Sequence, residues 1–233
     1  MALQIIITSL LCGVFCLGPL ALYLMWLGAL NRRSRPTVVG GPWDFVALVA
    51  GLAGFLLFGG AVVLAGADTA ARSALGGNWA QLRGAWGADR IVWFALTAGY
   101  LVFVGGFLAF GVWGRVRTLA VYNLTRERAE TAVESVLAET GVPAARFGNV
   151  WATGGSHVVA VDVFPGFRHV TVRLLASEPR VREELERGLR TRFEAVPVGD
   201  NPIAVWVTTA AVSCLIAALG CVLMLYYIFY AAG

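Results

Sequence analysis

The hydrophobic positions of this chain fall into long runs, and one long polar stretch interrupts them. Residues 2–30 contain no charged side chain, and further apolar runs cover residues 43–67, 91–114 and 203–230. Each run is at least as long as the roughly 20 residues that an α-helix needs to cross about 30 Å of hydrocarbon. The pattern therefore predicts an α-helical membrane protein with four transmembrane helices.

The polar stretch, residues 117–201, changes between helical and strand-like periods. Apolar residues recur at the helical period after Thr125 and again after Ser177, whereas valines alternate with polar or small residues on both sides of a Pro-Gly turn. A weaker strand is expected at residues 147–153. The order is α-β-β-β-α, and residues 118–124 fit either a strand ahead of it or the end of the third transmembrane helix.

These patterns divide the chain into three parts. Residues 1–116 hold three transmembrane helices, residues 117–201 form a small α+β domain between helices 3 and 4, and residues 202–233 hold the fourth helix. About 85 residues are enough for one small hydrophobic core. We therefore expect a membrane unit of four helices that carries one compact soluble domain.

The loop at residues 68–90 contains apolar side chains at a helical spacing. A short helix there would lie on the membrane surface, with two indole rings at the level of the headgroups. Glycines weaken that helix, so an irregular loop anchored by two interfacial tryptophans fits equally well. The residues concerned are Leu75, Trp79, Leu82 and Trp86.

Small residues recur at intervals of four along three of the expected transmembrane helices. This spacing lets two helix backbones approach closely within a membrane. We therefore expect helix-packing faces made by Ala47, Gly51, Ala50 and Gly54 in the second helix, by Ala95, Gly99, Gly105 and Ala109 in the third, and by Ser213, Ala217 and Cys221 in the fourth.

The basic residues, which are all arginines, predict the orientation of the chain. They concentrate after the first apolar run and after the third, at Arg32, Arg33, Arg35, Arg115 and Arg117. Basic residues in short loops accumulate on the cytoplasmic side of a membrane. The soluble domain is therefore expected in the cytoplasm and both termini outside, in a multi-pass protein of a bacterial inner membrane.

Side chains that carry chemistry are sparse. The two histidines, His157 and His169, each precede a strand of the expected hairpin, and His169 shares a strand face with Thr171 and Arg173, which predicts that it is solvated. Whether the two histidines have a role stays open. The four cysteines lie within apolar runs, where a thiolate is costly. The sequence therefore predicts no catalytic, metal or cofactor site.

The composition narrows the class of protein. The chain is 58% hydrophobic and 14% charged, whereas an ordinary globular domain has about 25% charged residues. The net charge of +4 comes without an uninterrupted basic stripe, so nucleic acid is not an expected partner. No expected transmembrane helix has a charged residue in its interior, which disfavours ion-coupled transport by this chain alone.

These observations predict a non-enzymatic accessory or scaffolding subunit of a larger membrane assembly. Its expected partners are membrane lipids and either other membrane subunits or further copies of itself. Two alternatives stay open. One is an oligomeric channel or transporter, and the other is a membrane-tethered sensor or regulator that acts through its cytoplasmic domain.

Overall fold

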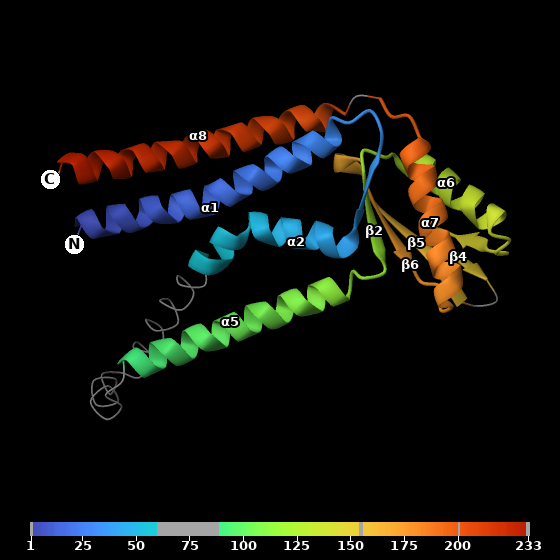
Figure 1. Ribbon diagram of the computed structural model, residues 1–233, viewed down its shortest axis with the longest axis horizontal. Helices are drawn as coiled ribbons and strands as arrows, with labels where there is room; N and C mark the ends of the chain where they lie inside the picture. The colour runs from blue at the N-terminus through green and yellow to red at the C-terminus, as the bar shows by residue number, and fades with distance from the viewer. Residues whose placement is uncertain (1, 60–88, 154–155, 200, 232–233) are drawn as a thin grey trace.

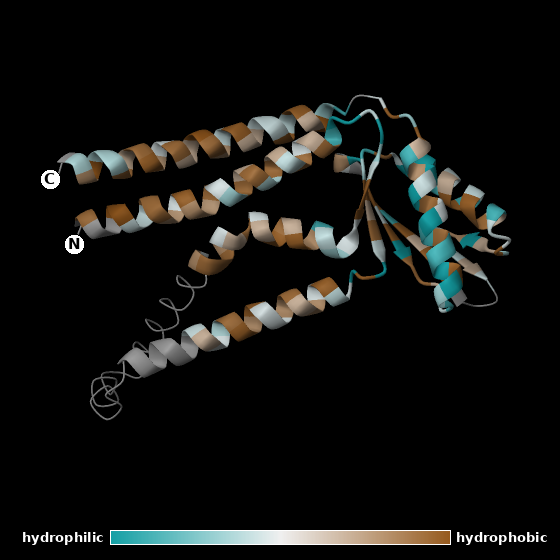
Figure 2. Cartoon of the chain, viewed as in Figure 1, coloured by the Kyte–Doolittle hydropathy of each residue, from teal (hydrophilic) through white to brown (hydrophobic). Residues whose placement is uncertain are grey.

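Long helices extend from one side of a sheet-and-helix domain (Figure 1). The computed structural model describes residues 2–59, 89–153, 156–199 and 201–231. The helices are apolar along most of their length, whereas polar residues gather in the domain (Figure 2). The expected surface-loop residues Leu75, Trp79, Leu82 and Trp86 lie outside the described residues.

Helices α1 (Ala2–Asn31) and α8 (Pro202–Ala231) lie side by side, although they come from opposite ends of the chain (Figure 1). Within them, Ile6–Asn31 and Pro202–Tyr230 are long and apolar enough to cross a membrane. The expected first and fourth spans are thus helices of the expected length, which supports a membrane protein.

The α1 and α8 backbones approach closely at two glycines of α1. A Cβ atom on Gly28 would lie 2.7 Å from the Thr208 hydroxyl oxygen, and one on Gly13 would lie 2.9 Å from the Cys221 sulfur. Four of the buried residues of α8 recur at every seventh position, and a fifth lies three positions after the first, which is the spacing of helices that pack with a small left-handed crossing. They are Ala204, Val207, Ala211, Ala218 and Leu225.

The expected second span differs more from the structure. Helix α2 (Gly41–Gly51) is followed by a second helical piece, Ala53–Gly59, at an angle of 54°. If the bent pair counts as one span, the described residues contain up to three membrane-spanning helices. Helix α5 (Asp89–Trp113) covers nearly the same residues as the expected third span, and Thr97–Trp113 is its apolar stretch among the residues whose side chains are described.

The domain is built on one antiparallel sheet with the strand order β1-β2-β6-β5-β4-β3. Its strands are β1 (Thr37–Gly40), β2 (Thr118–Tyr122), β3 (Ala145–Phe147), β4 (Val150–Thr153), β5 (Ser156–Phe164) and β6 (His169–Leu174). The expected valine hairpin is confirmed as β5 and β6, which a short 3₁₀ turn, Pro165–Phe167, connects. The segment at 118–124 is a strand rather than the end of a helix.

The sheet contains two features that the sequence pattern does not predict. Strand β1 follows the exposed arginines after α1, and it pairs with β2 from Thr37 opposite Tyr122 to Gly40 opposite Leu119. The single strand expected at 147–153 is the hairpin of β3 and β4. Gly148 turns that hairpin with a φ of +67°, a conformation that costs glycine little.

Helices α6 (Arg126–Glu139) and α7 (Pro179–Ala195) cover one face of the sheet. The strands present alternate residues to that face, as their period of two requires. The expected stripe of α7 packs there, with Leu185, Leu189 and Phe193 fully buried against strand residues Val121, Val159, Val161, Val170 and Val172.

The opposite face of the sheet lies toward the ends of α1, α2 and α5. Ala120 and Tyr122 of β2 pack there with Leu30 of α1. Hydrogen bonds hold the connections between the two units: the Asn123 side-chain amide donates to the Arg33 carbonyl oxygen at 2.8 Å, and the buried Asn201 amide donates to Asn31 Oδ1 at 2.9 Å. The sheet is thus fixed to the helices at several points.

Candidate functional site

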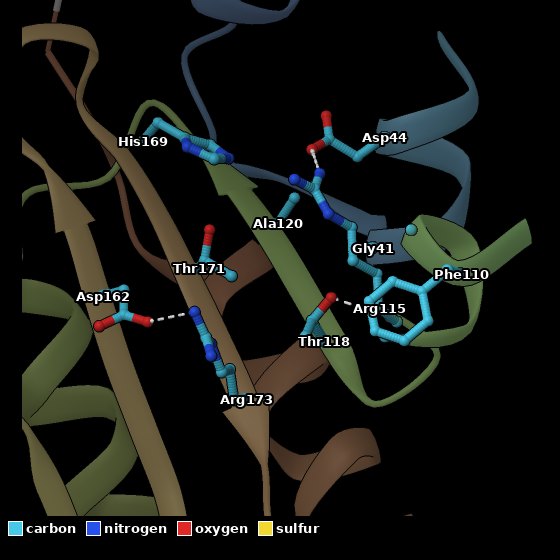
Figure 3. A pocket seen from close by; sticks show the side chains of 12 residues that line it. Gly41, Asp44, Phe110, Arg115, Thr118, Ala120, Asp162, His169, Thr171 and Arg173 are labelled. Atoms are coloured by element: carbon cyan, nitrogen blue, oxygen red, sulfur yellow. Dashed lines mark hydrogen bonds and ion pairs between the residues drawn. The ribbon is translucent and has the colours of Figure 1, made fainter. Parts of the chain in front are cut away.

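A cavity of about 370 Å³ lies between the face of the sheet opposite α6 and α7 and the ends of α2 and α5 (Figure 3). Because it is built from both the helices and the sheet, it is the place where the two units meet around an open space. Its lining residues are Gly41 and Asp44 from α2, Phe110, Gly111, Gly114 and Arg115 from α5 and the turn after it, and Thr118, Ala120, Asp162, His169, Thr171 and Arg173 from the sheet.

The sheet wall of the cavity follows from strand register. Ala120 lies opposite Thr171 on β2 and β6, and Asp162 of β5 lies opposite Thr171 on its other side. Alternate valines of these strands occupy the core, so the residues between them point to the other face. The small side chains of Ala120 and Thr171 leave room for the cavity.

Asp44 is the centre of the helix-side wall. It lies in the first turn of α2, where the positive end of the helix dipole favours a carboxylate. The Tyr122 phenol donates a hydrogen bond to its Oδ1 atom, and Arg115 Nη1 lies 3.9 Å from its Oδ2 atom. The Arg115 guanidinium also stacks over the Phe45 ring, 4.6 Å from the centroid.

Tyr122 acts as a neutral donor in this cluster. Burial raises its pKa well above the ordinary value for a phenol, and the hydrogen bond to Asp44 raises it further. Because the phenol keeps its proton at physiological pH, the bond to the carboxylate is charge-assisted. It joins β2 to α2 directly.

Two glycines, Gly41 of α2 and Gly111 of α5, allow close contacts near the turn between α5 and β2. A Cβ atom on Gly41 would overlap the Thr118 hydroxyl, which donates a hydrogen bond to the Arg115 carbonyl oxygen at 2.9 Å. A Cβ atom on Gly111 would lie 2.5 Å from the Phe45 ring. These contacts bring α2, α5 and β2 together and fix the position of Arg115.

His169 contributes an imidazole with unused hydrogen-bonding capacity. Its ring lies 4.7 Å from the Tyr122 ring, and its buried Nε2 atom has no hydrogen-bond partner in the part of the chain that the structure describes. Burial lowers the pKa of His169; Asp44 acts against this shift and Arg115 adds to it. The imidazole is therefore mainly neutral near pH 7.

A second ion pair lies on the sheet side of the cavity. Arg173 Nη2 is 3.1 Å from Asp162 Oδ2, and the Asn149 side-chain amide donates to Asp162 Oδ1 at 3.2 Å. Both charged side chains are about half exposed, so they form the open rim. The cavity thus holds two carboxylates, two guanidinium groups and a neutral imidazole, a set suited to binding polar groups of both signs.

The expectation that His169 is solvated is wrong, although the predicted strand face is correct. It shares the face of Thr171 and Arg173, but the ends of the helices cover that face. The side chain of His157 lies outside the described residues. Among the residues that are described, no group of three or more His, Cys, Asp or Glu side chains is placed to hold a metal ion.

The expected packing residues fall into two groups. Gly51 of α2 and Gly54 of the helical piece after it lie against α1: a Cβ on Gly51 would be 2.5 Å from Tyr23 Cβ, and one on Gly54 would overlap the Phe15 carbonyl. Cys221 faces Gly13 of α1. Gly99 and Gly105 make no such close approach within the described chain. The other expected packing residues are half-buried or exposed: Ala47, Ala50, Ala109, Ser213 and Ala217. The side chain of Ala95 lies outside the described residues.

The arginines that were expected to orient the chain also fall into two groups. Arg32, Arg33, Arg35 and Arg117 are exposed close to the junction, whereas Arg115 points into the cavity toward Asp44 (Figure 3). Sequence reasoning did not identify Tyr122 or the cavity itself. The available signal was Asp44, a carboxylate at the edge of an apolar run.

The chain was compared with protein families, curated proteins and solved structures. None of these comparisons gives a match. The function therefore has to be inferred from the helices, the sheet and the cavity between them.

Proposed function

We propose that the protein is a non-enzymatic accessory or scaffolding subunit of a larger membrane assembly. In this proposal four helices cross the membrane, the domain lies in the cytoplasm and both termini lie outside. The exposed arginines Arg32, Arg33 and Arg35 support this orientation, because they lie at the domain end of α1.

The observation that carries the proposal is a glycine face of α5 that no described residue covers. A Cβ atom added to Gly99, Gly105 or Gly106 would meet no described atom within 4 Å. Each glycine weakens an isolated helix by about 1 kcal/mol relative to alanine. In membranes such residues are typical of surfaces where a second helix approaches closely. A helix from another subunit, or from a second copy of this chain, fits this face.

The attachment of the domain supports a scaffolding role. β1 joins the sheet from the connection between α1 and α2, and Tyr122 binds Asp44 at the start of α2. A partner that packs on α5 therefore meets a domain in a fixed orientation. Such a subunit can hold a membrane partner and a cytoplasmic partner in one geometry.

The test is native mass measurement of the full chain after extraction in mild detergent. The proposal expects a complex larger than one chain. Gly105→Leu should release the partner because the larger side chain blocks close approach of a helix. The matched control is Gly18→Leu, since Gly18 of α1 is also open but has no small residue four positions away. A stable solitary monomer of the unaltered chain would contradict the proposal.

A further inference from the structure

The cavity has charged groups that the scaffolding role does not use. The pair Asp44–Arg115 lies on the helix side and the pair Asp162–Arg173 on the sheet side (Figure 3). The formal charges of the four groups cancel. The cavity therefore presents both signs of charge at separate places without a net charge.

The binding capacity on the helix side is only partly satisfied. The 3.9 Å separation between Arg115 and Asp44 is long for a charge-assisted hydrogen bond, and Tyr122 already occupies Asp44 Oδ1. A guanidinium has five N–H donors and binds phosphate oxygens with two of them at once. His169 Nε2 adds a buried position without a partner in the described chain. An anionic group there would satisfy both side chains.

The location of the cavity indicates where such a group comes from. Phe110, Gly111 and Gly114 form part of the wall, and they belong to the last turns of the apolar helix α5 or follow it directly. The apolar run of α5 ends just before Arg115. In the proposed topology the cavity thus lies at the level where a membrane helix leaves the hydrocarbon, and the end of that apolar helix forms part of its wall beside the charged groups. Its volume of about 370 Å³ is within the range of small-molecule sites.

We propose that this cavity binds the zwitterionic headgroup of a phospholipid, with the phosphodiester at Arg115 and His169 and a primary ammonium at Asp162. The phosphate oxygens accept hydrogen bonds from the guanidinium and from Nε2–H, and the ammonium donates to the carboxylate. The bound headgroup has no net charge, so the cavity remains neutral. A phosphoethanolamine headgroup satisfies these conditions.

The same chemistry distinguishes this headgroup from two others. A choline headgroup is also zwitterionic, but its quaternary ammonium has no N–H to donate to Asp162. A glycerol headgroup is anionic, so it leaves one uncompensated negative charge beside Asp44 and Asp162. The inference does not rest on the scaffolding role, because it needs no second protein chain.

The experiment measures lipids retained by the purified full chain. Phosphatidylethanolamine, phosphatidylcholine and phosphatidylglycerol with identical acyl chains are added in equal amounts, and bound lipid is counted by native mass spectrometry. Loss of one charge-assisted hydrogen bond corresponds to a roughly ten- to hundredfold change in affinity. We expect a preference of that size for the ethanolamine lipid.

Two variants assign the preference to the cavity. Asp162→Asn should remove the discrimination between ethanolamine and choline, and Arg115→Gln should weaken retention of all three lipids. Arg187→Gln is the control, because Arg187 is exposed on α7, on the covered side of the sheet. Circular dichroism of each variant establishes that it is folded, and Asp162 lies on the exposed rim, where an isosteric amide leaves the fold intact.

Three results would overturn the assignment. Equal retention of the three lipids by the unaltered chain would show only ordinary lipid around the helices. Displacement of the bound lipid by an equal concentration of free O-phosphoethanolamine would show that the ligand is a soluble molecule. Retention of the preference in both cavity variants would place the lipid elsewhere on the chain.

Discussion

Tyr122 of strand β2 donates a hydrogen bond to Asp44 of helix α2, across 78 positions of sequence. The bond joins a residue of the sheet to the first turn of a helix outside the domain. Because Asp44 is only 13% exposed, its carboxylate depends on such partners for the hydrogen bonds that water would otherwise supply. The attachment of the domain to the helices is therefore open to a direct test.

Tyr122→Phe removes this hydrogen bond and keeps the ring. A hydrogen bond to a charged group contributes about 1.5–3 kcal/mol, and we expect a loss of that size in the free energy of unfolding. Thermal unfolding of the full chain in detergent measures it. Tyr226→Phe, at an exposed position of α8, should leave the stability unchanged. Equal effects of the two substitutions would show that the Asp44 contact does not stabilise the junction.

Gly54→Ala should separate α1 from the helical piece Ala53–Gly59, because its methyl group would overlap the backbone of Phe15. Overpacking of this kind costs about 1–3 kcal/mol. Gly18→Ala adds the same methyl group where nothing lies within 4 Å, and the better helix propensity of alanine should leave the stability unchanged or slightly raised. Unfolding midpoints of the two variants provide the comparison, and a loss in Gly18→Ala alone would refute the packing described here.

Leu185→Ala should destabilise the domain by about 2–5 kcal/mol, because the leucine is fully buried between α7 and the sheet. Arg187→Ala, on the exposed side of the same helix, should cost no more than about 0.5 kcal/mol. The measurement requires the full chain rather than residues 117–201, since β1 supplies an edge strand from outside that segment. Similar losses in both variants would show that α7 packs with a different face.

The burial of His169 predicts that stability depends on pH. Burial lowers its pKa in the folded protein, whereas the unfolded chain titrates near pH 6.5. Between the two pKa values the unfolded chain holds a proton that the folded chain lacks, so stability is greatest above about pH 6.5 and falls as the pH drops through that window.

His169→Gln should flatten this dependence by up to about 1.4 kcal/mol per pH unit. Unfolding midpoints at about pH 5.5 and about pH 7.5 measure the slope for the unaltered chain and the variant. If the two slopes agree, other groups carry the pH dependence and folding does not lower the pKa of His169.

The arginines exposed at the junction should orient the chain. Neutral replacement of Arg32, Arg33, Arg35 and Arg117 leaves Arg115 in its contact with Asp44, and we expect about half of the molecules to be misoriented. A cysteine introduced at Ser34 or Asn149, both exposed, reports the side through labelling of intact cells in a cysteine-free background. Complete retention of the original orientation would mean that folding of the domain sets the topology.

Regular elements of the domain were predictable where a periodic pattern marks a buried face. Alternate valines identify β5 and β6, and a repeat of three to four residues identifies the buried stripe of α7. Strand β1 escaped prediction because it has only four residues, which is too short for a period, and its partner β2 is remote in sequence. The turn at Gly148 likewise divides a short apolar run into two strands.

The cavity was less predictable than the sheet. Its lining comes from two helices and three strands between Gly41 and Arg173. Because these residues are far apart in the sequence, no short motif indicates the cavity. The strand face of His169 could be deduced from alternation with Val170 and Val172. Its burial could not, because the helix ends that cover it are set by tertiary packing.

Strand β1 also has a consequence for the order in which the protein is made. Its residues leave the ribosome about 80 positions before β2, a delay of about 4–16 s at usual rates of synthesis. During that time β1 lies next to the end of α1 and its partner strand β2 has not yet been made. In the proposed topology the sheet can close only if the connection between α1 and α2 lies on the same side of the membrane as the domain. If that topology holds, we expect completion of the sheet to depend on correct insertion of the first two helices.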